Sequence, residues 1–299
     1  MGVFLLHGET MTYPTVVLYH DSCDDGFGAA WVAWKVFGDN ATYLPVRYGE
    51  PFPEIAWNCS LYILDFSYPR GVLEARALDE SYQNEKTSFV VLDHHKTAQE
   101  ALKGLPFCMF DMEKSGARLA WELWNCYQKS PDLINYIEDR DLWRFSLKNS
   151  CEVTAWLRSY PRNFEVWDRL HNHLKGNKWE VFSEGEAILR ASEQMVKRTC
   201  DQAWLGKLGV FSNIPIVNTA TLISEVGNEL CKRFPDSVFS ATYYDREQTR
   251  HWSLRSIVKT QNSRIQFDVS TVARKHGGGG HLGAAGFVQP LPSLTPWAP

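Results

Sequence analysis

In the first half of the chain, short apolar runs end where polar or charged residues begin. The three clearest cases are residues 16–19 before His20, residues 61–64 before Asp65, and residues 88–92 before Asp93, His94 and His95. Short, continuous apolar runs are typical of strands that are buried on both faces of a parallel sheet. Because ligands collect at the carboxyl ends of such strands, we expect these polar side chains to meet at one edge of the sheet.

Helical patterns alternate with these runs and predict an α/β domain in which helices flank a parallel sheet. The patterns cover residues 29–37, 71–78, 97–102 and 115–124, and Ser115 suits the N-cap position of the last one. A longer pattern from Trp179 to Trp204 has a single apolar stripe. It predicts a helix that connects two domains, although a helix within the first domain's own helical layer would show the same stripe.

Beyond Lys207 the apolar positions alternate as they do in half-buried strands, and helical patterns separate the alternating stretches. These stretches are residues 210–211, 214–216, 238–244 and 252–258. They predict a smaller α/β domain with a mixed sheet. The chain is then divided into a first domain over 14–178, a helical connector over 179–206, a glycine-rich domain over 207–290 and a Pro-rich tail over 291–299.

The charge balance changes along the chain. The 299 residues include 31 Lys and Arg against 35 Asp and Glu, a net charge of −4, which argues against a general binder of polyanions. From Lys207 onward there are 10 basic and 6 acidic residues (+4), which leaves 31 − 10 = 21 basic against 35 − 6 = 29 acidic residues (−8) in the remainder. Such a division suits a carboxylate metal centre that faces a phosphate-binding surface.

The spacing of the cysteines and the lengths of the apolar runs indicate the cellular compartment of the protein. The 7 cysteines lack CxxC or zinc-finger spacing, which argues against a disulfide framework and favours a reducing, cytoplasmic compartment. The N-terminus lacks the features of a signal peptide, and no apolar stretch approaches the ~18 residues that span a membrane. We expect a soluble protein with no membrane partner. Its oligomeric state stays open, with a homodimer as one option.

The polar residues at the predicted sheet edge have the chemistry of a metal site. His20, Cys23 and Asp25 lie on a strand-to-helix turn, and Asp65 and His94 follow neighbouring strands. Burying so many ionisable groups together is costly without a cation. Carboxylates mixed with imidazoles favour Mn²⁺ or Mg²⁺ over the zinc of thiolate-rich sites. The thiol could be a soft ligand, a bystander or a nucleophile, the last being the weakest reading because neighbouring carboxylates raise a thiol's pKa.

A second acidic cluster follows a later apolar segment. Asp139 and Asp141 stand on either side of Arg140, after residues 133–137. The cluster fits a solvated loop or an internal ion pair. One of the two carboxylates could instead complete the shell of a second metal ion, and of the two we favour Asp139.

A run of four glycines, residues 277–280, precedes His281 and the small residues 284–286. Glycines permit close approach of the backbone to a ligand, and consecutive N–H groups can form an anion-binding nest. The N–H groups expected to bind substrate are those of Gly278, Gly279 and Gly280. His281 could donate to a phosphate oxygen. A flexible linker is the alternative, but a linker would not continue into an apolar segment.

Arg255 lies within the alternating stretch over 252–258. Its guanidinium group could hold a phosphate through two parallel hydrogen bonds. A surface ion pair would explain an arginine at this position equally well. We include Arg255 with His281 in the predicted phosphate-binding surface.

Together these motifs resemble those of the DHH phosphoesterase superfamily. The matching residues are His20, Cys23 and Asp25 for its first motif, Asp65 for its second, Asp93-His94-His95 for the motif that names it, and Asp139 for its fourth. Residues 277–286 resemble the GGGHxxAAG signature of the accessory domain in RecJ-type exonucleases, nanoRNases and cyclic-dinucleotide phosphodiesterases. The similarity spans residues 16–287. It departs at Cys23, where an Asp ligand is expected, so that either Cys23 or Asp24 would take that place.

The resemblance implies a hydrolase with two divalent ions, Mn²⁺ before Mg²⁺ or Co²⁺. The implied ligands are His20, Asp25, Asp65 as a bridge, His94 and Asp139, with Cys23 as a further candidate. His95 would contact the substrate phosphate, and Asp93 would orient the neighbouring imidazole rings. Arg255, the glycines and His281 would hold the nucleotide or its terminal phosphate.

Among the activities of this superfamily we expect a phosphodiesterase that acts on short oligonucleotides or dinucleotides, because the charge pattern offers no long basic channel. A processive single-strand exonuclease is the close alternative. Phosphoanhydride hydrolysis is another, although the superfamily's pyrophosphatases and polyphosphatases lack the glycine-rich signature. A third alternative is a nucleotide-binding module whose catalysis is weakened by Cys23.

Overall fold

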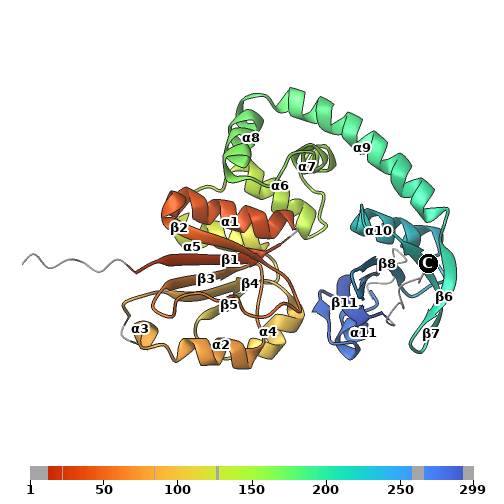
Figure 1. The fold of residues 1–299 in the computed structure, drawn as a ribbon. Coiled ribbons are helices and arrows are strands. Elements are labelled where there is room, and N and C mark those ends of the chain that lie inside the picture. The colour runs from red at the N-terminus through yellow and green to blue at the C-terminus, as the bar shows by residue number, and fades with distance from the viewer. Residues whose placement is uncertain (1–12, 22, 84, 126–127, 258–265, 292–299) are drawn as a thin grey trace, which may run out of the picture.

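The computed structural model describes residues 13–291 apart from positions 22, 84, 126–127 and 258–265. It contains two sheets, each packed with its own helices, and one long helix runs between them (Figure 1). All of the Pro-rich tail except Leu291 lies outside the described residues.

The first sheet is parallel throughout, as the short apolar runs predict. Its strands are β1 (Thr15–His20), β2 (Ala41–Val46), β3 (Ser60–Leu64), β4 (Phe89–Asp93) and β5 (Cys108–Phe110). They follow the order β2-β1-β3-β4-β5. Neighbouring residues of β1 face opposite cores: Val17 belongs to one apolar cluster and Leu18 to the other, and both are fully buried. Continuous apolar sequence is therefore required in β1.

Helices cover both faces of this sheet (Figure 1). One face carries α1 (Asp24–Phe37), α5 (Gly116–Asn125) and α6 (Asp132–Asp141), and the other carries α2 (Arg70–Ala77), α3 (Glu80–Gln83) and α4 (Lys96–Leu102); η1 (Gly38–Asn40) links α1 to β2. The oxygen Oγ of Ser115 accepts a hydrogen bond from the N–H of Arg118 at 3.2 Å. This is the N-cap that the sequence predicts for α5.

Three further helices extend the layer over α1: α7 (Ser150–Arg158), α8 (Phe164–Gly176) and the long α9 (Lys178–Cys200). Near its start, α9 buries Val181 in the core of the first domain. Near its end, it buries Val196 and Cys200 against residues of the second domain. The start of α9 therefore belongs to the helical layer of the first domain, and its end connects to the second domain. The helix ends at Cys200 rather than at Trp204, because Trp204 already belongs to the first strand of the second sheet.

The second sheet is mixed. Its strands are β6 (Trp204–Leu208), β7 (Phe211–Asn218), β8 (Ser240–Arg246), β9 (Thr249–Arg255), β10 (Gly279–Gly280) and β11 (Ala284–Pro290), in the order β10-β11-β9-β8-β7-β6. Only β7 and β8 pair in parallel. Helices α10 (Ile223–Arg233) and α11 (Ser270–Lys275) complete this smaller α/β unit, in agreement with the sequence pattern.

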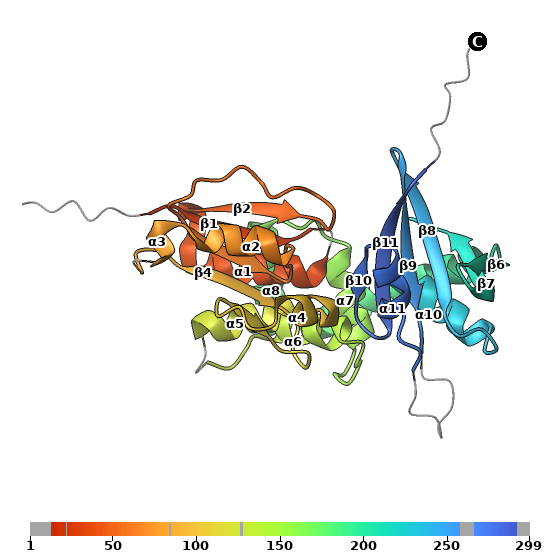
Figure 2. The ribbon, with the colours of Figure 1, turned by 90° about the horizontal axis from the view of Figure 1, so that it is seen from below.

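Side chains tie the two units together. Lys96 of α4 forms a 2.8 Å ion pair with Asp268, and Arg274 of α11 pairs with Glu100. At the other end of the contact, Glu225 of α10 accepts from two arginines of the first domain, which are described below. Figure 2 shows β10 and β11 directly beside the first domain. The described molecule therefore has its domains closed on one another.

Within the described part of the chain, none of the helices combines the length and apolar composition required to cross a membrane.

Candidate active site

The carboxyl edge of the first sheet brings three separate segments together. His20 is the last residue of β1, Asp65 follows β3 directly, and His94 follows β4. The Nδ1 atom of His20 lies 3.5 Å from Oδ2 of Asp65, and the Nε2 atom of His94 lies 3.1 Å from Oδ1 of the same carboxylate. Asp65 is thus the shared centre of the group.

Asp25 joins this group from the first turn of α1. Its carboxylate accepts hydrogen bonds from the backbone N–H groups of Gly116 (2.5 Å) and Ala117 (2.9 Å) at the start of α5. Carboxylates are favourable at this position because a helix N-terminus presents free N–H donors and a positive partial charge. The oxygen Oδ2 of Asp25 also lies 3.5 Å from Nε2 of His94.

Gly116 lets α5 come this close to Asp65. A Cβ atom at position 116 would lie 2.8 Å from Oδ1 of Asp65 and in closer conflict with its Cβ. We expect Gly116→Ala to displace Asp65 and to reduce metal affinity by roughly 10- to 100-fold, the range for changes that misplace a ligand. Isothermal titration with Mn²⁺ measures this. Gly71→Ala is the matched control, because a Cβ at position 71 meets no atom within 4 Å; equal losses in both variants would contradict the steric argument.

Burial and neighbouring charges shift the pKa values of the side chains in this group. Burial, followed by the charges of Asp65 and Asp141, raises the pKa of Asp25 well above its usual range. Burial also opposes ionisation of Asp65, but its contacts with His20 and His94 outweigh burial and lower its pKa. The same carboxylates overcome burial at His94 and raise its pKa. A divalent cation would compensate the buried carboxylates of this group.

The donor atoms fit divalent cations. Both oxygens of Asp65 and Nδ1 of His20 are buried without a hydrogen-bond partner, a costly state unless a cation satisfies them. Four groups of three side chains each bring one donor atom per residue within 4.8 Å of the others, and two of them are His20, Cys23 and Asp65, and Asp25, Asp65 and His94. Because both groups share Asp65, the arrangement suits a pair of ions with this carboxylate between them.

The structure distinguishes Cys23 from Asp24, the two candidates for the place of the Asp ligand that is expected in the first motif. Cys23 immediately precedes α1 and belongs to the donor group. Burial, then the charges of Asp65 and other carboxylates, raises the pKa of its thiol well above the usual range, which argues against a nucleophile. The carboxylate of Asp24 instead pairs with Arg162 at 2.7 Å and Arg158 at 3.3 Å. Asp24 therefore does not replace Cys23 in the donor group.

The structure does not bring Asp139, which the sequence favours as a ligand, into any of the donor groups of the described residues. Its carboxylate accepts hydrogen bonds from the N–H and Oγ of Ser146, at 2.9 and 2.6 Å, and from the N–H of Leu147 at 3.2 Å. The carboxylate that faces the site is that of Asp141, whose Oδ2 lies 3.5 Å from Nε2 of His94. Both residues end α6, and helical geometry turns them in different directions.

Asp93 and His95 form a second pair beside the donor group. Oδ1 of Asp93 lies 2.6 Å from Nδ1 of His95 and accepts from the backbone N–H groups of His94 and His95, while Oδ2 accepts from Oγ of Ser67 at 2.5 Å. Burial disfavours a charged His95, but the charge of Asp93 outweighs it and raises the histidine's pKa. Asp93 therefore orients the ring of His95, and it positions His94 only through the backbone.

His281 reaches this pair from the second domain. Its ring centroid lies 4.7 Å from that of His95 and 4.8 Å from that of His94. Burial, followed by the positive charges of these two histidines, lowers the pKa of His281 to about 3. The ring is therefore a neutral side chain that can donate one hydrogen bond at the edge of the site.

The glycines before His281 pack closely against neighbouring elements. A Cβ at position 279 would lie 2.6 Å from Oγ1 of Thr97, to which the N–H of Gly280 donates at 3.2 Å. A Cβ at position 278 would lie 2.6 Å from Cβ of Phe287 on β11. None of the three predicted glycines lines the cleft described next. Their role is to let the loop approach α4 and so to place His281.

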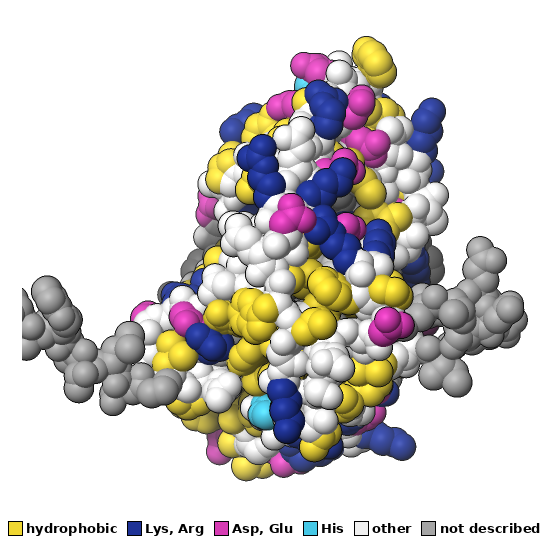
Figure 3. All heavy atoms as spheres, turned by 90° about the vertical axis from the view of Figure 1, so that its right-hand side faces the viewer, with side chains coloured by type: hydrophobic (Ala, Val, Ile, Leu, Met, Phe, Trp, Pro, Cys, Tyr) yellow, Lys and Arg dark blue, Asp and Glu magenta, His cyan; other side chains and the backbone are white. Residues whose placement is uncertain are grey.

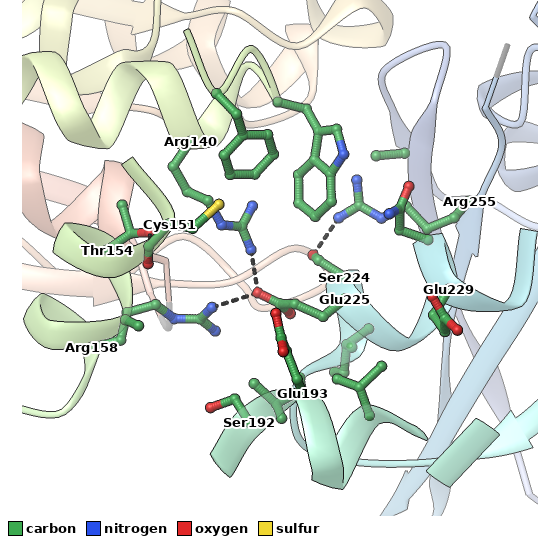
Figure 4. A pocket seen from close by; sticks show the side chains of 18 of the residues that line it. Arg140, Cys151, Thr154, Arg158, Ser192, Glu193, Ser224, Glu225, Glu229 and Arg255 are labelled. Carbon is green, nitrogen blue, oxygen red and sulfur yellow. Dashed lines mark hydrogen bonds and ion pairs between the residues drawn. The ribbon is translucent and has the colours of Figure 1, made fainter. Parts of the chain in front are cut away.

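A cleft of about 1840 Å³ lies between the domains beside the donor group. Arg140, Asp141 and Trp143 line it from the first domain, and Arg255 and His281 line it from the second. Figure 4 shows the guanidinium groups of Arg140 and Arg255 on its walls. Each lies over the indole ring of Trp143, with Cζ at 4.3 Å and 5.2 Å from the ring centroid.

Arg255 is not a surface ion-pair residue. It donates to Oγ of Ser224, and no carboxylate of the described residues lies within salt-bridge distance of it. Burial, then the neighbouring charge of Arg140, lowers its pKa to about 10. The group remains charged at neutral pH, and an anion in the cleft would compensate it.

The sequence patterns did not identify Glu225, which forms ion pairs with Arg140 and Arg158. Oε1 of Glu225 accepts from Arg140 at 2.6 Å and from Arg158 at 2.9 Å, across the domain boundary (Figure 4). Arg140 stands in the acidic cluster that the sequence singles out, but the position of Glu225 on an amphipathic helix carries no comparable signal.

Comparisons with known proteins agree with this architecture. No family model matches the sequence. An uncharacterized protein of Acanthamoeba polyphaga mimivirus, R106, is 30% identical, and the match covers 91% of this chain and 66% of that protein. Among solved structures, the DHH domain of a member of a family of ribosomal proteins matches with a TM-score of 0.52 at 12% identity, over 93% of this chain and 83% of that one.

Two further solved structures match with lower TM-scores. A pGpG-specific phosphodiesterase, PggH of Vibrio cholerae, has a TM-score of 0.47 at 14% identity, over 93% of this chain and 94% of that one. RecJ of Thermus thermophilus, in complex with Mn²⁺, has the same TM-score and identity, over 91% of this chain and 49% of RecJ.

Proposed function

Since this chain has the fold of DHH-domain proteins, we propose that it is a two-metal-dependent phosphodiesterase that hydrolyses short oligonucleotides or dinucleotides. One observation carries the proposal. Asp141, which faces His94 of the buried donor group, and His281, which lies against His94 and His95, both line a cleft that also holds the cationic Arg255. A metal centre beside a cleft with a cationic group suits a phosphate ester.

In this proposal the metal ligands are His20, Cys23, Asp25, Asp65, His94 and Asp141. A pair of divalent ions, when bound, lowers the pKa of water and neutralises charge on the attacked phosphate. His95, held by Asp93, whose charge raises the pKa of the ring, would face the same phosphate and stabilise the negative charge that develops on it.

The second domain would bind the substrate. His281 would donate a hydrogen bond to a phosphate oxygen beside His95, and Arg255 would hold another phosphate deeper in the cleft. Trp143 lies beside both guanidinium groups, with its ring centroid 4.3 Å from Cζ of Arg140 and 5.2 Å from Cζ of Arg255. The indole would hold the two arginines in place at the cleft.

The charges on one face of the second domain suit a short substrate better than a long polymer. Basic and acidic side chains are interspersed on the face of the second domain that Figure 3 shows, rather than gathered in a continuous basic stripe. Binding to a long nucleic acid depends on many cationic contacts along the backbone. The cationic groups concentrated in the cleft suit a substrate with few phosphates.

A length series tests the proposal. We expect kcat/KM to be highest for substrates of two to a few nucleotides, with Mn²⁺ or Mg²⁺, and to fall as length increases to ten. Product release from labelled substrates, resolved by chromatography, measures this. Activity that grows with length would favour a processive exonuclease. Release of phosphate from pyrophosphate without cleavage of dinucleotides would favour the phosphoanhydride alternative, and tight dinucleotide binding without turnover would favour a weakened binding module.

His281→Ala is expected to weaken substrate capture while leaving the metal ions bound. Loss of a hydrogen bond to a charged phosphate should raise KM by roughly 10- to 100-fold. Steady-state kinetics beside metal content by mass spectrometry separates the two effects. His276→Ala is a matched control, since His276 stacks on Phe287 at 4.4 Å and does not line the cleft. Loss of metal from the His281 variant alone would contradict this division of roles.

A further inference from the structure

The donor group nearest β1 contains a cysteine. His20, Cys23 and Asp65 each offer one donor atom, and these atoms lie within 4.8 Å of one another. Among the described cysteines, Cys23 alone belongs to such a group. Buried Cys59 and Cys231, by contrast, donate to backbone carbonyl oxygens.

The backbone holds Cys23 in this position. Its carbonyl oxygen accepts the first intrahelical hydrogen bond of α1, from the N–H of Phe27 at 3.1 Å. Gly26 lets that first turn lie against β1, because a Cβ there would come within 2.8 Å of Cβ of His20 and closer still to its carbonyl oxygen. The sulfur is therefore brought to the histidine by two packed elements rather than by a loose loop.

The polar atoms beside the sulfur point to a ligand. The Nδ1 atom of His20 and both carboxylate oxygens of Asp65 are buried and have no hydrogen-bond partner. Asp65 is 1% exposed. A cation at this position would satisfy Nδ1 of His20 and one oxygen of Asp65 together with the sulfur, and the other oxygen of Asp65 would face the neighbouring position.

The two halves of the centre differ in chemistry. The first offers an imidazole nitrogen, a sulfur and a carboxylate oxygen. The second offers the carboxylates of Asp25, Asp65 and Asp141 around His94. Thiolate ligands select zinc and similar borderline ions, whereas carboxylate-rich sets suit manganese and magnesium.

We propose that the two metal positions are unequal: the position formed by His20, Cys23 and Asp65 takes a thiolate-binding ion such as Zn²⁺, Co²⁺ or Fe²⁺, and the position around Asp25, His94 and Asp141 takes Mn²⁺ or Mg²⁺. The inference rests on the two-ion centre of the proposed function. It replaces the expectation of two equivalent manganese ions with a mixed pair.

Cobalt spectroscopy tests this without any substrate. Metal-free protein, kept reduced, is titrated with Co²⁺ while absorption is recorded, because a cobalt–thiolate bond produces a charge-transfer band in the near ultraviolet. We expect two bound Co²⁺ per chain and a band that saturates with one of them. Zn²⁺ should abolish the band by displacing that ion, whereas an equal amount of Mn²⁺ should leave it intact.

Substitutions show whether the sulfur of Cys23 is the source of the band. Cys23→Ser should lose the whole band and one of the two ions. Cys23→Asp should keep two ions without a band and lose much of the preference of that position for Zn²⁺ over Mn²⁺. Cys108→Ser is the matched control, since the half-buried Cys108 lies on β5 outside every donor group and the band should persist.

The outcomes separate this inference from the proposed function. Two bound Co²⁺ without a band, no bound Co²⁺, or a band that survives in Cys23→Ser would each overturn the unequal centre. A protein with the expected band that hydrolyses no phosphodiester would contradict the proposed function and leave the unequal centre standing. Hydrolysis by a protein that binds two Mn²⁺ and shows no cobalt–thiolate band would support the proposed function and contradict the unequal centre.

Discussion

Asp65→Asn is expected to abolish turnover, with a fall in kcat of more than about 100-fold, since even changes around a ligand cost up to that factor. Asp65 is the member common to both donor groups, so an amide there weakens both metal positions at once. Asparagine also suits the local backbone, because Asp65 has a φ of 56° and asparagine is one of the few residues that tolerate this left-handed region. The substitution therefore removes the charge with little steric change.

Metal content and unfolding of the metal-free protein show whether the loss is specific. The carboxylate of Asp65 lies beside His20 and His94, and these contacts lower its pKa, so its neutral replacement should modestly lower the stability of the metal-free chain. We expect the metal-free variant to fold and to unfold at a modestly lower temperature than the wild type, and we expect Mn²⁺ to stabilise the variant much less than it stabilises the wild type. A variant that keeps both ions and full activity would refute the central role of this carboxylate.

The second large effect distinguishes the two acidic residues at the end of α6. Asp141→Asn should lower kcat by more than about 100-fold, because Asp141 faces His94 and completes the second donor group. Asp139→Asn should instead lower the free energy of unfolding by about 1–3 kcal/mol, because an amide cannot accept all the hydrogen bonds from Ser146 and Leu147. Chemical denaturation and steady-state kinetics on both variants measure the two effects.

Each variant is the control for the other. If loss of activity followed Asp139 while Asp141 could be replaced freely, the geometric assignment would be wrong and the original sequence interpretation would be restored. If both changes reduced only stability, the end of α6 would contribute no metal ligand.

The sequence allowed the sheet edge to be predicted because strand pattern and chemistry coincide there. An apolar run that ends at His20, Asp65 or Asp93 identifies both the strand and its carboxyl end. The second sheet was predictable for a similar reason, since alternation marks its half-buried strands. Helices α6 to α8 were harder to predict from the sequence, because their buried positions are mixed with exposed charges.

The glycine-rich segment illustrates the limit of a motif. Consecutive glycines indicate close approach of the backbone, and the sequence does not state what approaches. In the structure the nearby groups are Thr97 of α4 and Phe287 of β11. The prediction of a special backbone at this position was therefore sound, while the prediction of a bound anion at Gly278, Gly279 and Gly280 has no support in the geometry.

By itself, the sequence determined that polar donors of the right kinds lie at the ends of buried strands, because alternation and apolar runs depend only on local periodicity. Tertiary structure decided which of them meet. Asp141 rather than Asp139 faces His94, Asp24 turns to arginines, and Glu225 crosses to the first domain. These outcomes depend on the direction of each side chain and on the packing of elements distant in sequence, and neither property is written in the local pattern of residues.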